Sequence, residues 1–244
     1  PRIRRLLAAL GEPTTAAGLA TPHNSATIPE PPGVRGGAPP SSRQPSRQAA
    51  VLVLFSDANR PDLTFVERAA NLRHHPGQIA FPGGKLEAGE TEIDAALREA
   101  QEEILLDPAE VVAHAAVPVS RVAVSYFDVS AVVGTWDGTA PIGVGDPGEV
   151  AAVHRFAVED MADPANRLLA ALPGGYRGPA FTMGDIFVWG FTANMVSHIL
   201  DLGGWTRPWS PGRIAAVPQR FLRDAQRGTG TAASWADSAE DTGE

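Results

Sequence analysis

The sequence contains no cysteine among its 244 residues. This absence excludes disulfide bonds, thiolate catalysis and cysteine-bound zinc. No apolar run reaches the roughly 20 residues that a membrane-spanning helix needs. Residues 2–10 are more typical of a short amphipathic helix than of a signal peptide, because Gly11 and Pro13 end the apolar run early. We therefore expect a soluble, cytoplasmic protein with no membrane partner.

Positive charge is also scarce, with 20 lysines and arginines against 28 acidic residues and a net charge of -8. This balance argues against a nucleic-acid polymer as the partner. Small anionic metabolites are compatible with it if metal ions and local arginines mask the charge. The glycines of a serine nucleophile elbow are missing around Ser125, which argues against serine hydrolysis.

Composition divides the chain into three parts. Residues 1–48 form an N-terminal extension that is rich in proline, glycine and serine and has few large apolar residues, so we expect it to be mobile. Residues 49–223 have the apolar content of a folded domain. Residues 224–244 are small, polar and acidic, and we expect a flexible tail.

The folded part alternates apolar runs with one strong helical pattern. Residues 50–55 are almost continuously apolar, which is typical of a strand buried on both faces. Further strands are expected at residues 63–68, 111–119, 122–136, 149–156 and 186–190, and a late helix at residues 191–202. This order favours an α/β fold with a mixed sheet between helices.

The strongest helical pattern belongs to residues 84–106, GKLEAGETEIDAALREAQEEILL. Its apolar residues recur at helical spacing, while Glu99, Glu102 and Glu103 fall together on the opposite side. Like charges at this spacing repel, so one interpretation is a solvated acidic face. The other is a site for hard divalent cations, which bind carboxylate oxygens.

The loop before this helix helps to choose between the two interpretations. Thr91 and Asp94 have the spacing of a capping pair, so a strand, a loop and a helix are expected in succession. The glycines imitate a phosphate-binding P-loop, but Glu90 stands where that motif has its lysine. A carboxylate there would repel phosphate unless a metal intervened, which favours the metal site.

These residues resemble the Nudix box, the signature of the Nudix hydrolases. The charged positions that fit its spacing are Glu90, Arg98, Glu99, Glu102 and Glu103, preceded by Gly84. One position departs, because Leu105 stands where the family has a glycine that ends the helix in a left-handed conformation. A leucine there should cost about 1 kcal/mol or let the helix run on.

The resemblance implies a Nudix α/β/α sandwich with a mixed β-sheet and metal-assisted hydrolysis of a diphosphate. It implies that Glu99 and Glu103 bind Mg²⁺ or Mn²⁺, with Glu102 completing the acidic face and Glu90 close by. Arg98 would pair with a carboxylate of the box and fix its direction. The general base stays open between a glutamate of the box and a carboxylate of residues 146–149.

A second stretch, residues 68–84, brings two arginines and two histidines directly before this loop. These side chains either pair with nearby acids or bind a polyanion, since guanidinium groups match phosphate oxygens. The stretch resembles the segment that marks the coenzyme A diphosphatase branch of the Nudix hydrolases, as residues 146–150 and 186–193 do more weakly. The substrate-binding residues implied are Arg68, Arg73, His74, Gly83 and Gly84.

The leading hypothesis is therefore hydrolysis of coenzyme A or acyl-coenzyme A to adenosine 3',5'-bisphosphate and 4'-phosphopantetheine. One alternative is another nucleoside diphosphate derivative, such as NADH, ADP-ribose or a nucleotide sugar. Another, from a different class, is a catalytically weak sensor of a nucleotide or acyl-coenzyme A. Trp189 and Phe191 are more simply explained by core packing than by stacking on a substrate. The sequence leaves the oligomeric state open, a homodimer included.

Overall fold

The computed structural model describes residues 2–10, 47–122, 127–172, 175 and 177–222. Almost all of the stretch expected to be a mobile linker, and all of the expected acidic tail, lie outside these residues. Within the described residues, no helix is both long enough and apolar enough to cross a membrane.

The main sheet has seven strands and is mixed, as predicted. Its path runs β3-β2-β1-β6-β5, with β4 pairing to β1 and β7 to β2. Strands β1 and β6 are parallel, whereas the other pairs are antiparallel. The strands are β1 (Arg47–Ser56), β2 (Asp62–Arg68), β3 (Ile79–Ala80), β4 (Gly83–Lys85), β5 (Val112–Val122), β6 (Phe127–Trp136) and β7 (Val150–Ala157).

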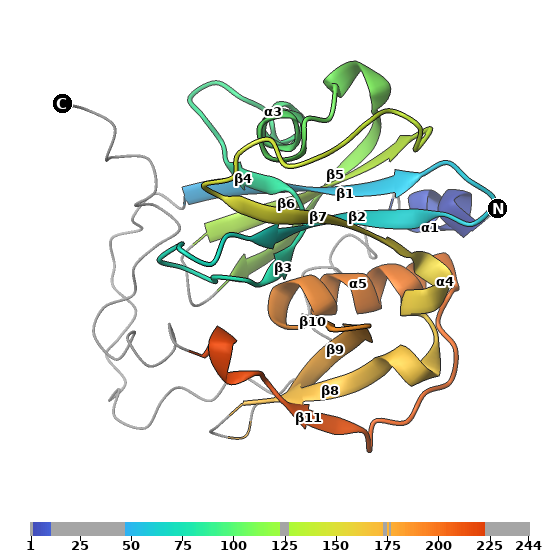
Figure 1. Ribbon diagram of the computed structural model, residues 1–244. Helices are drawn as coiled ribbons and strands as arrows, with labels where there is room; N and C mark the ends of the chain where they lie inside the picture. The colour runs from blue at the N-terminus through green and yellow to red at the C-terminus, as the bar shows by residue number, and fades with distance from the viewer. Residues whose placement is uncertain (1, 11–46, 123–126, 173–174, 176, 223–244) are drawn as a thin grey trace, which may run out of the picture.

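Helices cover both faces of this sheet (Figure 1). Helix α3 (Glu92–Ile104) lies on one face, and α5 (Gly190–Gly203) lies on the other. Strand β1 explains why both faces are covered, since its side chains alternate between two cores. Ala50, Leu52 and Leu54 pack on the α3 side, and Val51, Val53 and Phe55 pack with α5. The predicted strand buried on both faces is confirmed.

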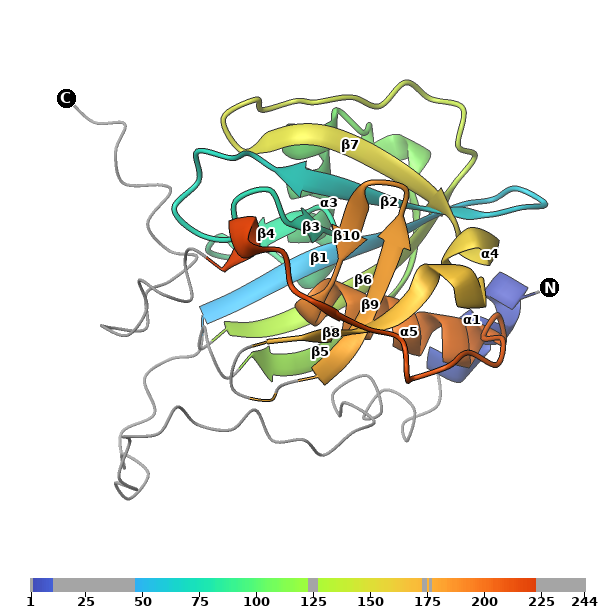
Figure 2. The ribbon, with the colours of Figure 1, turned by 60° about the horizontal axis from the view of Figure 1, so that its bottom comes forward.

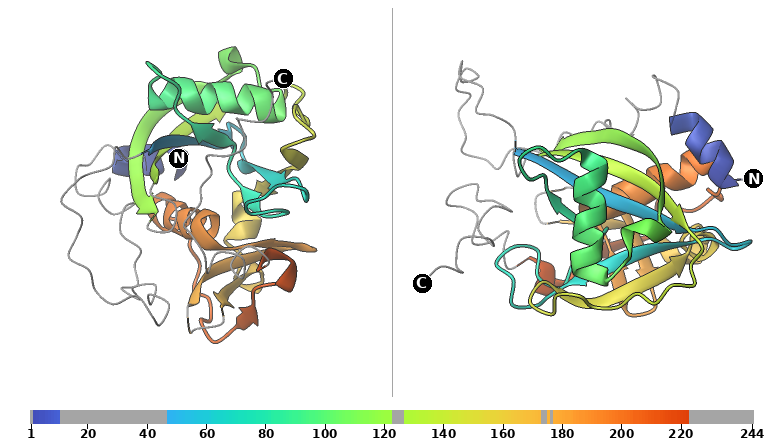
Figure 3. Two further views of the ribbon diagram at one scale, coloured as in Figure 1. Left: turned by 90° about the vertical axis from the view of Figure 1, so that its left-hand side faces the viewer. Right: turned by 90° about the horizontal axis from the view of Figure 1, so that it is seen from above.

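A second sheet lies beyond α5 (Figure 3), and only one of its strands, the one expected at residues 186–190, is predicted by the sequence. It has the order β10-β9-β8-β11 and consists of β8 (Arg167–Ala171), β9 (Arg177–Met183), β10 (Ile186–Val188) and β11 (Ile214–Ala216). These strands are short, and β9 contains Gly178 and Pro179, two residue types that sheets disfavour. Their pattern of alternating apolar and polar residues is weak. They form a sheet because segments far apart in the chain pair, such as β11 with β8.

The first helix, α1 (Arg2–Leu10), corrects one expectation about the N-terminal extension. It is the short amphipathic helix that the sequence predicts, but it is not a loose segment. Leu6 and Leu10 are buried in the same core as Ile199 and Leu200 of α5. Burial of this apolar stripe holds residues 2–10 on the domain.

Short elements complete the structure. They are α4 (Val158–Met161) and the 3₁₀ turns η1 (Pro108–Glu110), η2 (Pro164–Asn166) and η3 (Gln219–Phe221). The long strand expected at residues 122–136 is split, because residue 122 ends β5 and β6 begins at Phe127. The turn η3 lies close to the loop between β2 and β3 (Figure 2).

Candidate metal and diphosphate site

Helix α3 is fixed in place by its cap and by its apolar face. The Thr91 hydroxyl accepts a hydrogen bond from the Asp94 amide at 3.2 Å, and the Asp94 carboxylate accepts one from the Thr91 amide at 3.2 Å. This reciprocal pair is the capping box that the spacing predicts. Ala95, Ala96 and Ala100 are fully buried on the β1 side, and their small side chains let the helix approach the sheet closely.

The helix ends at Leu105, the position where the sequence departs from the Nudix pattern. Leu105 takes the left-handed conformation, with φ 58° and ψ 25°, and its side chain is exposed. Its amide donates to the carbonyl of Gln101 at 3.1 Å. The helix therefore ends where the glycine of the family pattern would end it, with Leu105 in a left-handed conformation that costs a residue other than glycine about 1 kcal/mol.

Glu103 is the most deeply buried carboxylate of the box, with 3% of its surface exposed. The amide of Gly83, in β4, donates a hydrogen bond to Glu103 Oε2 at 2.9 Å. Burial raises the pKa of Glu103 to about 8, although this hydrogen bond acts in the opposite direction. The negative charge of Glu99 raises the pKa further.

Glu99 lies one turn before Glu103 and faces the same glycine loop. A Cβ atom on Gly84 would come within 2.3 Å of Glu99 Oε1, so a larger residue here would force the Glu99 carboxylate out of its present position. Burial is the main cause that raises the pKa of Glu99, and Arg98 opposes it. Two carboxylates whose charged forms are disfavoured thus lie against Gly83 and Gly84.

Arg98 forms the carboxylate pair that the sequence predicts. Its guanidinium contacts both oxygens of Glu90, with Nε to Oε1 at 2.7 Å and Nη2 to Oε2 at 3.2 Å. It also donates to Glu99 Oε1 at 3.1 Å and to the carbonyl of Lys85 at 3.0 Å. The hydrogen bond from Arg98 lowers the pKa of Glu90. Arg98 therefore ties the loop before α3 to the helix.

Glu102 differs from its two neighbours. Its side chain is 58% exposed, and its carboxylate accepts a hydrogen bond from Arg98 at 3.4 Å. The arrangement brings Glu99 and Glu103 together but leaves Glu102 at the rim. Among the described residues, no group of three or more His, Asp and Glu side chains has a geometry that could hold a metal ion.

A further carboxylate, Glu149, joins the site from the loop before β7. Its charge raises the pKa values of both Glu99 and Glu103. This loop packs along the end of α3, where the amides of Gly143 and Gly145 donate to the carbonyls of Ile104 and Glu103 at 3.0 and 2.9 Å. The sequence named residues 146–149 only as one possible source of the base, because nothing local places this loop on α3.

Arg68 connects this carboxylate group to the predicted substrate stretch. It ends β2, and burial lowers its pKa, while the charges of Glu103, Glu149 and Glu99 act in the opposite direction. The next amide, that of Ala69, donates to the carbonyl of Glu149 at 2.7 Å. A cation thus faces the carboxylates, as the resemblance implies for a residue near phosphate.

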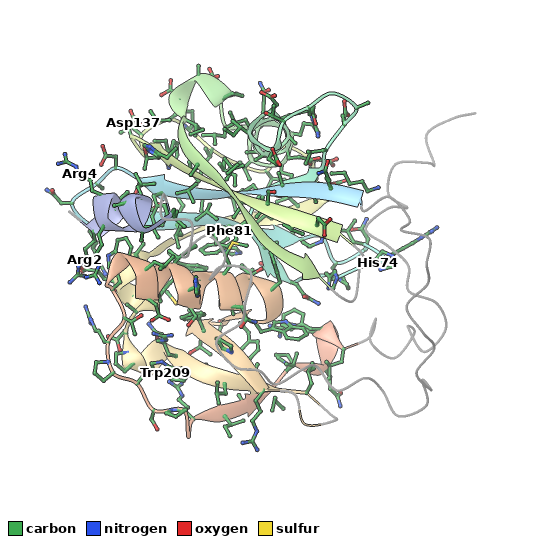
Figure 4. The ribbon with its side chains drawn as sticks, turned by 180° about the vertical axis from the view of Figure 1, so that it is seen from behind. Arg2, Arg4, His74, Phe81, Asp137 and Trp209 are labelled. Carbon is green, nitrogen blue, oxygen red and sulfur yellow. The ribbon has the colours of Figure 1, made fainter. Side chains whose placement is uncertain are left out.

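The other two predicted substrate residues, Arg73 and His74, belong to the loop of residues 69–78. Arg73 is exposed and His74 partly exposed. The loop closes through the amide of Gly77, which donates to the Arg68 carbonyl at 3.0 Å. Figure 4 shows His74 at the end of the molecule opposite Arg2 and Arg4 of α1.

The chemistry of the donor set suits a divalent metal ion, but the side chains would have to draw closer together to hold one, since no three of them in the described part of the chain already form such a group. Carboxylate oxygens are the ligands that Mg²⁺ and Mn²⁺ prefer. The charge of Glu149 raises the pKa values of Glu99 and Glu103, and the charge of Glu99 also raises the pKa of Glu103, so these carboxylates repel one another in a largely buried place. A bound cation would relieve this repulsion.

Comparison with known proteins agrees with this geometry. Residues 45–172 match the NUDIX domain family. A Cronobacter sakazakii protein named "Uncharacterized Nudix hydrolase NudL" is 36% identical over 166 residues, which cover 64% of this chain and 83% of that protein. A Citrobacter koseri protein of the same name is 45% identical over 89 residues, which cover 36% of this chain and 46% of the relative.

Among solved structures, a Nudix hydrolase from M. smegmatis, RenU, is similar with a TM-score of 0.48 and 16% identity, over 68% of this chain and 90% of that chain. The chain thus spans about half of the length of the Citrobacter koseri relative and most of the length of the Cronobacter sakazakii relative. The matched family region contains β1 to β7, α3 and the glycine loop that faces Glu99 and Glu103. On this evidence, the chain belongs to the Nudix family.

Proposed function

We propose that the protein is a metal-dependent diphosphatase that hydrolyses coenzyme A or acyl-coenzyme A. Nudix enzymes are hydrolases that act on pyrophosphate bonds and generally need divalent metal ions. Water would add to one phosphorus of the diphosphate, and the bridging oxygen would leave on the other. The products are adenosine 3',5'-bisphosphate and 4'-phosphopantetheine, or its acyl derivative.

One observation supports this substrate most directly. The stretch of residues 68–84, whose pattern resembles the coenzyme A branch, begins and ends at the buried carboxylate. At one end of the stretch, the charge of Glu103 acts on the pKa of Arg68. At the other end, the Gly83 amide donates a hydrogen bond to the Glu103 carboxylate. Phosphates held by the stretch between these two residues would therefore stand beside the carboxylates.

Glu99 and Glu103 would hold Mg²⁺ or Mn²⁺, and Glu149 or Glu102 would complete the set. Such ions neutralise diphosphate oxygens and lower the pKa of a bound water. The side chains and backbone of the protein would position the metal ligands and the phosphates. Arg98 fixes Glu99 through its hydrogen bond, and Gly83 and Gly84 allow the backbone to come close to the phosphates.

The basic side chains of residues 68–84 would bind the negative charge of the substrate that the metal ions do not neutralise. Coenzyme A carries a 3'-phosphate in addition to its diphosphate. Arg68 is partly buried beside the carboxylates, so we assign it to the diphosphate. Arg73 and His74 lie farther along the loop, Arg73 exposed and His74 partly exposed, so we assign them to the 3'-phosphate.

The test is product analysis after incubation with coenzyme A, dephospho-coenzyme A, NADH and ADP-ribose, each with Mg²⁺, with Mn²⁺ and with a chelator. We expect metal-dependent release of adenosine 3',5'-bisphosphate, with coenzyme A the fastest substrate. Faster cleavage of another diphosphate would contradict the substrate and keep the chemistry. Binding without any cleavage would favour the sensor.

Arg73→Gln tests the assignment of the 3'-phosphate. We expect KM to rise about tenfold or more for coenzyme A but little for dephospho-coenzyme A, because loss of a phosphate contact weakens binding. Arg177→Gln, which changes an exposed arginine of the second sheet, is the matched control. Equal losses on both substrates would assign Arg73 to the diphosphate or to structure.

A further inference from the structure

The C-terminal turn η3 packs against the loop that carries the predicted substrate residues. The nearest atom to the open side of Gly77 is Phe221 Cε1, 3.6 Å from the position that a Cβ would take. Phe221 is 4% exposed and belongs to the hydrophobic cluster of the second sheet, so its ring is held in place while one edge faces Gly77. The turn stands about fifty residues beyond the matched family region, which ends at residue 172. Through η3, the segment that follows β11 thus reaches the loop of residues 69–78.

Phe221 is itself held by the aromatic residue that precedes α5. The rings of Trp189 and Phe221 stack with centroids 6.4 Å apart and planes 25° apart. Helix α5 is tied to the other end of the loop, because the Thr192 hydroxyl donates to the Ile79 carbonyl at 2.9 Å in a buried hydrogen bond. The stack and this bond link the loop to one rigid element.

The loop needs such support because its backbone is strained. His75 has φ 56° and Gly77 has φ 67°, so two residues of three are left-handed. For a residue other than glycine, this conformation costs about 1–2 kcal/mol. Strained segments persist where surrounding structure holds them in place. The hydrogen bond from Gly77 to Arg68 closes the base of the loop, and the Phe221 ring faces the side of Gly77 on which a Cβ would stand, 3.6 Å from that position.

We propose that Phe221, supported by Trp189, is a positioning residue that holds the loop of residues 69–78 in its substrate-binding conformation. This inference rests on the proposed function for the role of Arg73 and His74. Both views place η3 beside this loop (Figure 1, Figure 2). The C-terminal segment thus sets substrate affinity without touching the reacting phosphates.

The position of Phe221 predicts a specific kinetic result. The loop offers Arg73 and His74 to the substrate, whereas Glu99 and Glu103 lie on α3 and keep their contacts with β4 and Arg98. Loosening the loop should therefore weaken substrate binding and spare the chemical step. We expect Phe221→Leu to raise KM about tenfold and to change kcat less than about twofold.

The experiment compares Phe221→Leu with Val217→Ala. Val217 is buried in the same cluster, four residues earlier, and provides a control for general loss of packing. Phe221→Tyr keeps the ring and should restore the wild-type KM. Hydrogen exchange of the Gly77 and Gln78 amides, measured without substrate, reports on the loop alone.

Faster exchange of these amides in Phe221→Leu, but not in Val217→Ala, together with the rise in KM, would establish the positioning role. Unchanged exchange would overturn it, whichever substrate the enzyme cleaves. Equal changes in both variants would assign Phe221 to general packing and also overturn it. Because the exchange measurement needs no substrate, failure of the proposed function on coenzyme A would be seen separately.

Discussion

The backbone amide of Gly83 donates a hydrogen bond of 2.9 Å to the buried carboxylate of Glu103, twenty residues later in the chain. This contact joins the glycine loop to α3 at the candidate metal site. The loop can approach closely because a Cβ on Gly83 would lie 2.3 Å from the Ala50 carbonyl, so only glycine fits. The geometry of the site thus depends on Gly83, which has no side chain, and on Glu103, whose carboxylate is buried.

Glu103→Gln tests the carboxylate. The amide group keeps the size of the side chain and an oxygen that accepts from Gly83, but it is a much weaker metal ligand. We expect kcat to fall by more than about 100-fold, beyond the loss caused by removing an outer-shell partner. Thermal unfolding should show that the variant is folded. An unchanged rate would remove Glu103 from the mechanism.

The raised pKa of Glu103 predicts how stability depends on pH in the absence of metal. The folded state keeps its proton up to about pH 8, whereas the unfolded carboxyl loses it near its ordinary pKa of 4.5. Between these values the folded state binds more protons, so the free energy of unfolding falls as pH rises. Denaturation with urea and a chelator at several pH values measures this slope.

Glu103→Gln is the control for this slope, because it removes the titrating group. The difference in unfolding free energy between wild type and variant should shrink or reverse from pH 5 to about pH 8. Mg²⁺ or Mn²⁺ should stabilise the wild type most at the high end, since the ions bind the charged form. A difference that does not vary with pH would contradict the burial argument.

Two glycines of the loop before β7 form a matched pair of variants. A Cβ on Gly145 would lie 2.0 Å from the Glu102 carbonyl oxygen, whereas a Cβ on Gly143 would meet nothing within 4 Å. Gly145→Ala must push the loop off α3, which should cost about 1–3 kcal/mol of stability and displace Glu149. Gly143→Ala should stay within about 0.5 kcal/mol of wild type.

Activity measurements on the same pair test the contribution of Glu149. We expect kcat to fall in Gly145→Ala and to stay close to wild type in Gly143→Ala. Equal activities in two folded variants would show that the position of this loop does not matter for turnover.

Leu105→Gly should stabilise the protein by about 0.5–1 kcal/mol. Glycine tolerates the left-handed conformation that Leu105 adopts, and this relief exceeds the extra entropy of the unfolded chain. Leu105→Ala keeps the Cβ and should not gain this stability. Urea denaturation of both variants measures the difference, and a gain of equal size in the alanine variant would assign the effect to the exposed leucine side chain.

The sequence by itself determined the elements whose signals are local. The capping pair Thr91 and Asp94 predicts the start of α3, and the apolar residues at helical spacing predict its length. The apolar run at residues 50–55 predicts the central strand β1. Arg98 finds its carboxylate partners within one short segment, so its pairing was also predictable. Such features depend on neighbours three or four positions away, or on one loop, which spacing alone describes.

The tertiary structure decided which of the residues with equivalent spacing in the sequence are buried and which are exposed. Glu102 and Glu103 are adjacent glutamates, but one is exposed and the other buried, because packing of the β4 loop covers only one of them. The second sheet, the arrival of Glu149 beside α3 and the contact of Phe221 with Gly77 all join segments far apart in the chain. Their geometry follows from chain topology and burial, which no local pattern encodes.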